Sequence, residues 1–195
     1  MKRLFDIVAS FLGLLLLSPL FLLVAVSIKL DSPGPVFFRQ ERMGRGFRPF
    51  YIHKFRTMIQ YAPYKGGPIT SGEDPRITRV GRLLRKAKID ELPQLINVLK
   101  GEMSFVGPRP EVRRYVELFR EDYEEILKAR PGITDLASLE FRDETAVLGQ
   151  FENPEDEYIR SILPAKIRLS REYLKRSSFF SDVGLILRTL VRLFH

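Results

Sequence analysis

The chain has 195 residues, no cysteine, two histidines and a formal net charge of +8 at pH 7. This length suits one compact domain. The missing cysteines exclude disulfides and thiolate metal sites, and they suit a reducing compartment. The positive charge indicates an anionic partner: a nucleic acid, an anionic membrane face or a phosphorylated substrate.

Residues 7–28 form an apolar run without a single charged side chain. As a helix, at about 1.5 Å per residue, this run is long enough to cross a hydrocarbon layer of roughly 30 Å. The sequence therefore predicts a membrane segment. A signal peptide, a spanning helix and a re-entrant hairpin compete, but the long core directly after Asp6 is atypical of a signal peptide.

The residues that flank and interrupt the run distinguish the other two arrangements. Lys2 and Arg3 precede it and a series of basic residues follows it, so both flanks favour the cytoplasm. Ser18-Pro19 lies near its middle, where proline removes a helix hydrogen bond and the serine hydroxyl can satisfy a freed carbonyl. A bent helix that enters and leaves by one face accounts for both features. Spanning helices also tolerate proline, so both arrangements remain open at this level.

After a turn at residues 31–35, the sequence predicts strands at 36–40 and 47–55, joined by a hairpin turn at 43–46. A loop at 61–75 precedes a very basic helix at 76–88. Arg79, Arg82 and Lys86 share one stripe of that helix. It either lies at a headgroup interface with its apolar side inserted or packs on the domain core.

Two adjacent carboxylates, Asp90 and Glu91, come directly before a helical apolar repeat. That repeat consists of Leu92, Leu95, Ile96 and Leu99. Proline is tolerated in the first turn of a helix, so Pro93 places Asp90 at or beside the N-cap and Glu91 in the first turn. Taken alone, the two carboxylates are most simply a cap and a partner of the helix dipole.

Further along, Gly101 is the expected helix C-cap, and Pro108 and Pro110 hold Arg109 in an extended conformation that suits phosphate binding. Amphipathic helices are expected at 111–128 and 182–194. The chain contains no G-x-S-x-G, Walker loop or G-x-G-x-x-G motif. What remains is carboxylate chemistry on a phosphorylated substrate, with arginines and a divalent cation neutralising charge.

Several motifs in order resemble the bacterial sugar transferases, the monotopic phosphoglycosyl transferases that begin glycan assembly on a polyprenyl lipid. The resemblance covers nearly the whole chain, in what looks like the minimal catalytic form. It rests on Lys54-Phe55-Arg56-Thr57-Met58, Leu84-Arg85-Lys86, Asp90-Glu91-Leu92-Pro93-Gln94, Asn97-Val98-Leu99-Lys100-Gly101, Val106-Gly107-Pro108-Arg109-Pro110 and Pro131-Gly132-Ile133-Thr134.

The resemblance implies a mostly helical α+β fold at the inner membrane of a bacterial cell. Residues 1–30 would be a re-entrant membrane anchor, bent at Ser18 and Pro19. Residues 31–195 would form a catalytic domain on the cytoplasmic face, with a small β-hairpin and amphipathic interfacial helices. Its partners would be membrane lipids, and other glycan-assembly enzymes could join them. No nucleic acid is expected.

The resemblance also implies a two-step exchange. Asp90 attacks the β-phosphate of a UDP-sugar, UMP leaves, and polyprenyl phosphate then takes the phosphosugar from the enzyme. Glu91 assists proton handling for the lipid phosphate, and Mg²⁺ sits against Asp90. A helix N-terminus and nearby arginines are expected to keep Asp90 ionised.

The substrate-binding residues implied by the resemblance are mostly basic, and they are Arg85, Arg109, Pro108, Pro110, Lys54, Arg56 and Arg142. Lys88, Asp135 and residues 140–144 depart from the commoner family pattern, at positions expected to read the sugar, so the donor stays open. Two other classes also stay open: a membrane-tethered scaffold in which Asp90 only caps a helix, and a basic nucleic-acid-binding module, which the apolar run disfavours.

Overall fold

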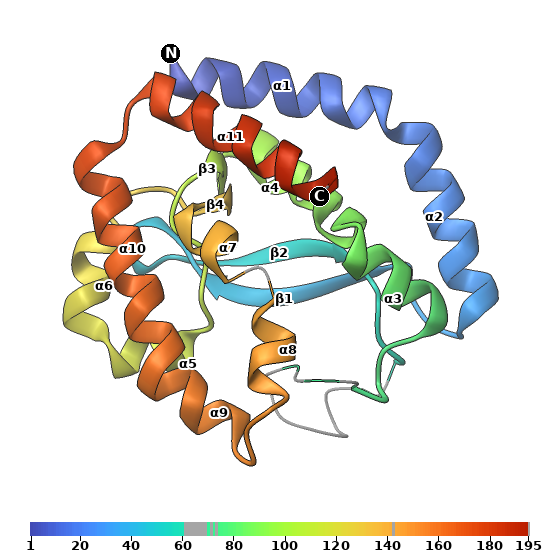
Figure 1. Ribbon diagram of the computed structural model, residues 1–195. Helices are drawn as coiled ribbons and strands as arrows, with labels where there is room; N and C mark the ends of the chain where they lie inside the picture. The colour runs from blue at the N-terminus through green and yellow to red at the C-terminus, as the bar shows by residue number, and fades with distance from the viewer. Residues whose placement is uncertain (61–69, 71, 73, 142, 195) are drawn as a thin grey trace.

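The computed structural model describes residues 1–60, 70, 72, 74–141 and 143–194. It has the predicted mostly helical α+β architecture, in which a small antiparallel hairpin lies at the centre and helices surround it (Figure 1). The first two helices run along one edge of the molecule, and the last helix lies beside the first. The division into an anchor at 1–30 and a catalytic domain at 31–195 stays a prediction.

The apolar run folds as two helices, α1 (Lys2–Leu16) and α2 (Ser18–Asp31), which meet at an angle of 59°. Pro19 lies in the first turn of α2, where its missing N–H costs no hydrogen bond. The Ser18 hydroxyl donates to the Leu15 carbonyl at 2.8 Å, as the sequence predicted. Among the described residues no single helix has the length and apolar character of a membrane span, whereas this bent pair together does.

Polar contacts attach the start of α1 to the rest of the chain. Arg3 donates to the carbonyls of Val98 at 2.6 Å and Leu99 at 2.9 Å, the last turn of α4 (Leu95–Lys100). Lys2 forms an ion pair of 2.6 Å with Asp182 of α11 (Phe179–Phe194). The first residues of the chain are therefore held against elements from its middle and its end.

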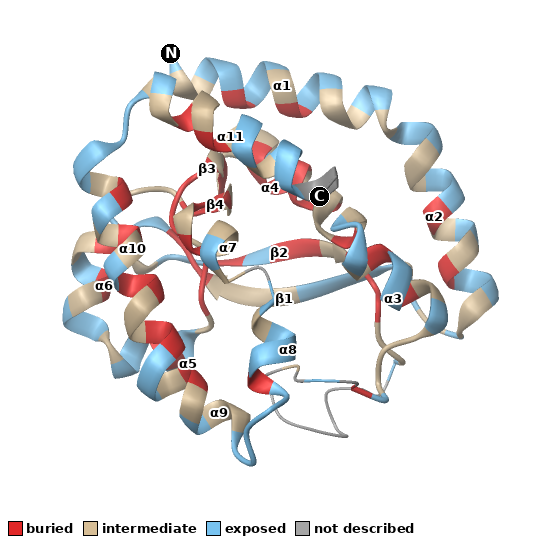
Figure 2. Ribbon diagram, viewed as in Figure 1, coloured by how far each residue is buried: buried red, intermediate tan, exposed pale blue. Residues whose placement is uncertain are grey.

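Asp6 makes a third attachment from inside α1. Its buried carboxylate accepts from the Ser104 hydroxyl at 3.1 Å and from the Phe105 N–H at 3.2 Å, both in β3 (Ser104–Val106). The outer surface of α1 and α2 is nonetheless strongly apolar (Figure 2). Its exposed side chains include Leu4, Ile7, Val8, Phe11, Leu12, Leu15, Leu16, Leu22, Leu23, Val26 and Leu30.

The predicted hairpin is present, with β1 (Phe37–Met43) and β2 (Pro49–Phe55) joined through the 3₁₀ turn η1 (Arg45–Phe47). Phe38 lies opposite Lys54 in its register. A second, parallel pair joins β3 to β4 (Gly132–Thr134), which the sequence analysis did not predict. Both of its strands have only three residues, too few to show a periodic pattern.

The predicted basic helix is α3 (Arg79–Lys86), and Thr78 caps it by accepting from the Gly81 N–H. Arg79, Arg82 and Lys86 are exposed, whereas Leu84 is buried. Leu83 is 69% exposed on the same outer side. The helix packs beside α2 (Figure 1).

The helix predicted at 111–128 is two helices, α5 (Arg113–Leu118) and α6 (Arg120–Ile126), which meet at Phe119. Phe119 packs against the core, whereas Leu118 is 56% exposed. The buried stripe follows a spacing of four through Tyr115, Phe119 and Tyr123, which turns residue 118 outward.

The remaining helices pack around this core (Figure 2). They are α7 (Leu136–Glu140), α8 (Glu144–Leu148), α9 (Pro154–Glu157), the π-helical turn η4 (Tyr158–Ile162) and α10 (Leu163–Arg176). The largest buried cluster is formed mainly by α5, α6, η4 and α10. It stabilises the half of the molecule that carries Arg109.

Candidate active site

Asp90 and Glu91 lie in a 3₁₀ helix, η3 (Ile89–Gln94), that packs against β2 and leads into α4. Lys88 occupies the N-cap position, so Asp90 is the second residue of the helix and its side chain caps no backbone N–H. The prediction of a capping Asp90 is therefore wrong. Pro93 has no N–H to donate, so the chain adopts the tighter 3₁₀ turn up to Gln94 and becomes α-helical at Leu95.

Asp90 is only 8% exposed, and its Oδ1 atom is buried without a hydrogen-bond partner among the described residues. Burial raises the pKa of its carboxyl group, against the opposing charges of Lys54 and Arg85. This reverses the expectation that the surroundings favour its ionised form. The physical reason is that removing the carboxylate from water outweighs the nearby positive charges.

Glu91 bridges two basic side chains that come from distant parts of the chain. Its Oε1 atom accepts from Lys54 Nζ at 2.7 Å and from Arg109 Nη2 at 2.8 Å. Burial by itself would raise the pKa of Glu91, but Arg109 and Lys54 outweigh it and hold that pKa well below its usual range. Burial lowers the pKa of Lys54. Glu91 is thus ionised near neutral pH and holds both cations.

The two prolines beside Arg109 are buried and belong to the frame of the site. The Pro108 carbonyl accepts from the Gly132 N–H at 3.0 Å. A Cβ at Gly132 would lie 2.1 Å from the Gly107 nitrogen. The backbones at residues 107 and 132 therefore approach more closely than a residue with a side chain would allow. This packing fixes the backbone position from which the Arg109 side chain extends.

Asp135 then holds Arg109 in place, a role that the sequence analysis missed. Its Oδ2 atom accepts from the Arg109 N–H at 3.2 Å, and its Oδ1 atom caps α7 by accepting from the Ser138 N–H at 2.7 Å. Arg109 Nη1 donates to the Ser138 hydroxyl at 3.4 Å. The available signal was Asp135 itself, because aspartate is a preferred N-cap residue and an apolar segment follows it.

Arg85 comes from α3, and its charge interacts with that of Asp90. Its Nε atom donates to the Thr57 hydroxyl at 2.9 Å, and burial lowers its pKa while the Asp90 charge acts in the opposite direction. A Cβ at Gly81 would lie 2.1 Å from the Thr57 carbonyl oxygen, so α3 packs directly on this backbone. Thr57 is the second residue of the site without a role in the sequence analysis.

The site therefore combines an unpartnered buried carboxylate oxygen with basic side chains from three different elements. Asp90 and Glu91 come from η3, Lys54 from β2 and Arg85 from α3, while Arg109 follows β3. Over residues 1–195 the chain matches the family model described as "Bacterial sugar transferase". The chain belongs to the bacterial sugar transferase family.

Characterised relatives of this sugar transferase act on undecaprenyl phosphate, according to their names. It is 42% identical over 194 residues to the UDP-N-acetylgalactosamine-undecaprenyl-phosphate N-acetylgalactosaminephosphotransferase of Aeromonas hydrophila. It is 41% identical over 194 residues to the UDP-glucose:undecaprenyl-phosphate glucose-1-phosphate transferase of Caulobacter vibrioides, and 38% over 196 residues to that of Escherichia coli.

These alignments include nearly all of this chain but only part of most relatives. They cover 97% of the chain and 42% of the Aeromonas protein, 97% and 68% for the Caulobacter protein, and 98% and 40% for the Escherichia coli protein. The relatives differ in the sugar that their names carry. Family membership therefore leaves the donor sugar undetermined.

Within the sugar transferase, one of the predicted substrate-binding residues, Arg56, binds a different part of the chain. Arg56 is buried, and its guanidinium donates to the carbonyls of Ser32 at 2.8 Å and Pro33 at 2.6 Å, at the end of α2. It thus ties the second helix to the hairpin. Arg142 lies outside the described residues.

A magnesium ion can be tested against the residues that are present. Among the described residues, no group of three or more His, Cys, Asp or Glu side chains is arranged to hold a metal. Mg²⁺ usually takes only one or two protein carboxylates, together with water and substrate phosphates. The unpartnered Oδ1 atom of Asp90 fits an ion shared with a phosphorylated ligand.

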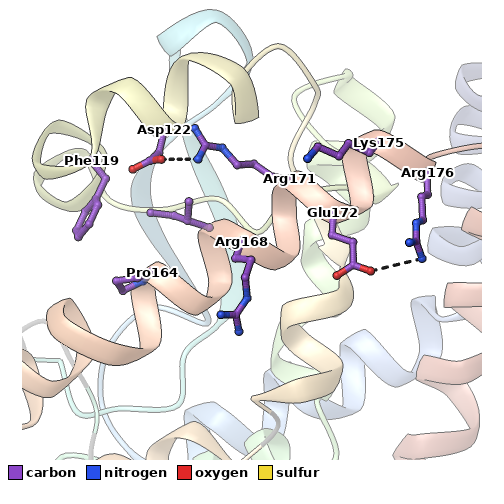
Figure 3. Close-up of a pocket in the computed structure, with 9 residues that line it drawn as sticks. Phe119, Asp122, Pro164, Arg168, Arg171, Glu172, Lys175 and Arg176 are labelled. Carbon is purple, nitrogen blue, oxygen red and sulfur yellow. Dashed lines mark ion pairs between the residues drawn. The ribbon is translucent and has the colours of Figure 1, made fainter.

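A cavity of about 480 Å³ lies away from these carboxylates, between α6 and α10 (Figure 3). Arg171 pairs with Asp122 at 2.8 Å on one side of it, and Arg176 with Glu172 at 3.6 Å on the other. None of the site residues above lines it. Arg171 and Arg176 are thus already paired with carboxylates of the same chain.

Proposed function

We propose that this chain transfers a sugar-1-phosphate from a UDP-sugar to polyprenyl phosphate through a covalent aspartyl intermediate and releases UMP. The observation that carries the proposal is Asp90, whose buried Oδ1 atom has no hydrogen-bond partner among the described residues and which directly precedes Glu91, the residue that holds Lys54 and Arg109. The names of the relatives support the two substrates.

In the first step, Asp90 attacks the β-phosphorus of the UDP-sugar. A bond forms between its carboxylate oxygen and phosphorus, and the bond between that phosphorus and the bridging oxygen of UMP breaks. UMP leaves with the electron pair. Arg85, Arg109 and Lys54 offset the negative charge on the phosphates. A bound Mg²⁺ would add positive charge at the phosphates and at Asp90.

In the second step, a phosphate oxygen of polyprenyl phosphate attacks the same phosphorus. The bond from phosphorus to Asp90 breaks, which restores the carboxylate and yields polyprenyl-diphosphate-sugar. We assign Glu91 chiefly to holding Lys54 and Arg109, because both cations bond to its Oε1 atom. A carboxylate with such a low pKa is a weak base, so any proton that it takes from the lipid phosphate requires these contacts to loosen.

The proposed placement is monotopic, with α1 and α2 as a re-entrant hairpin in the bacterial inner membrane and the catalytic residues on the cytoplasmic face. Arg3 supports it, because this residue of the N-terminus donates to carbonyls of α4 in the catalytic part of the chain. A helix that crossed the membrane would separate the two. The exposed apolar side chains of α1 and α2 supply the surface that lipids would cover.

The test is UMP release from a panel of UDP-sugars, with purified protein in detergent, Mg²⁺ and polyprenyl phosphate. Without acceptor, intact-protein mass spectrometry should detect one phosphosugar added to the wild type and none to Asp90→Asn, which should also lose turnover by at least 10³-fold while membrane association is retained. An adduct on the asparagine variant would contradict the role of Asp90. UMP release without transfer to the lipid would contradict the acceptor.

A further inference from the structure

Lys88 adopts a left-handed backbone conformation, with φ 55° and ψ 17°, directly before η3. This conformation favours glycine or asparagine over residues with long side chains. Its N–H donates to the Arg85 carbonyl at 3.1 Å and its carbonyl accepts from the Glu91 N–H at 3.3 Å. Both hydrogen bonds use backbone atoms only. The turn therefore does not need the lysine side chain, and glycine would form it with less strain.

The lysine side chain is exposed beside a buried carboxylate. In the described part of the chain, its ammonium group makes no hydrogen bond and no ion pair. Lys88 is the N-cap residue of η3 and lies two positions before Asp90 in the chain.

The other cations of the site are already held by groups of the protein. Lys54 and Arg109 share the Oε1 atom of Glu91, and Arg85 donates to the Thr57 hydroxyl. These three come from inside the fold and are preorganised for a ligand that enters it. Lys88 instead is exposed, and its ammonium group makes no hydrogen bond or ion pair with the described part of the chain that would occupy its hydrogen-bonding capacity.

Exposed apolar side chains on α3, which directly precedes Lys88, and on the neighbouring α2 indicate which ligand approaches from this side. Leu83 of the preceding helix is 69% exposed, and α3 packs beside α2, whose Leu22 and Leu23 are exposed (Figures 1 and 2). This apolar surface suits a lipid chain. A lipid that lay along it would bring its phosphate to Asp90 past the ammonium group of Lys88.

We propose that Lys88 binds the phosphate monoester of the polyprenyl acceptor and that it contributes little to binding of the UDP-sugar. The inference rests on the proposed function and adds the residue that receives the second substrate. It also changes the sequence-based expectation, in which Lys88 belonged to the region that reads the sugar.

The test separates the two half-reactions. Exchange of labelled UMP into UDP-sugar, without acceptor, measures the first, and the KM for polyprenyl phosphate measures the second. Lys88→Gly removes the charge and accepts the left-handed backbone, Lys88→Arg keeps the charge, and Lys86→Gln removes a neighbouring exposed charge from α3 as a matched control.

We expect Lys88→Gly to raise the KM for polyprenyl phosphate about tenfold, the effect of losing one charge-assisted hydrogen bond, and to leave UMP exchange within twofold. Its thermal midpoint should equal or exceed that of the wild type, which excludes loss of the fold. Lys88→Arg and Lys86→Gln should keep the wild-type KM within about twofold to threefold.

Three outcomes would overturn the proposal. An unchanged acceptor KM in Lys88→Gly would remove the role of Lys88. Impaired UMP exchange in the same variant would assign Lys88 to the donor. An equal rise of the acceptor KM in Lys86→Gln would show that general surface charge, and not Lys88 itself, sets this KM. Failure of the proposed function itself would be recognised separately, because the wild type would then show no UMP exchange with any UDP-sugar.

Discussion

Lys2 and Asp182 form an ion pair of 2.6 Å that joins the first helix of the chain to the last. Asp182 is buried and also accepts from the Tyr173 hydroxyl at 2.8 Å, whereas Lys2 is 41% exposed. The pair lies where α1 crosses β3 and α11, so it connects the proposed membrane anchor to the catalytic part of the chain.

Replacing Asp182 by alanine should therefore loosen α1. We expect a loss of about 1–2 kcal/mol in the free energy of unfolding, below the value for a fully buried pair because water reaches Lys2. Faster hydrogen exchange in residues 2–10 should accompany it. Arg176→Ala is the control, since its ion pair with Glu172 is largely exposed and should contribute close to nothing. Unchanged exchange in α1 would show that other contacts hold this helix.

Glu91→Gln should impair catalysis by releasing the two cations. The amide can still accept hydrogen bonds but no longer carries the charge that holds Lys54 and Arg109, and we expect kcat to fall 10- to 100-fold. UMP release under saturating substrates measures this. Retained kcat would mean that Lys54 and Arg109 keep their positions without the carboxylate.

Ionisation of the Glu91 carboxyl group should make the free energy of unfolding depend on pH. The folded-state pKa of Glu91 lies below its unfolded value of about 4.3, so its ionisation stabilises the fold fully above that pH. This stabilisation is lost as the pH falls through the folded-state pKa. The difference in unfolding free energy between wild type and Glu91→Gln should therefore shrink below about pH 4.3, as urea titrations from pH 3 to pH 7 would measure. A difference independent of pH would contradict it.

Gly81→Ala should disturb the contact between α3 and Thr57. The added Cβ would lie 2.1 Å from the Thr57 carbonyl oxygen, a backbone atom that cannot rotate away. We expect a stability loss of about 1–3 kcal/mol by thermal unfolding, together with reduced activity. Gly184→Ala is the matched control. Nothing lies within 4 Å of its added Cβ in helix α11, so stability should stay equal or rise by up to about 1 kcal/mol.

Thr57→Val should weaken donor binding through Arg85. It removes the hydroxyl that accepts from Arg85 Nε and keeps the shape of the side chain. The KM for the UDP-sugar should rise about tenfold, the effect of one hydrogen bond to a charged group. Thr57→Ser should restore the wild-type KM. Equal values for valine and serine would show that Thr57 does not position Arg85.

Much of the local structure follows from the sequence alone. The uncharged run with Ser18-Pro19 predicts a bent apolar helix. The strand patterns on either side of the turn at residues 43–46 predict the β-hairpin. Gly101 caps its helix in the left-handed conformation, with φ 85°. Each of these depends on interactions between residues close together in the chain, and for this reason a local pattern is sufficient to predict it. The order of motifs that resembles the family can be recognised in the same way, since it needs no tertiary contacts.

The ion pairs and the pKa shifts of the site residues follow only from the tertiary structure. Lys54, Glu91 and Arg109 meet at one oxygen atom although they lie far apart in the sequence. Burial raises the pKa of Asp90, while the two cations lower that of its neighbour Glu91. Arg56 lies two residues after Lys54, but its guanidinium group instead donates hydrogen bonds to carbonyls at the end of α2. Desolvation and charge pairing depend on the groups that folding brings into contact, so adjacent carboxylates in the sequence acquire opposite properties in the fold.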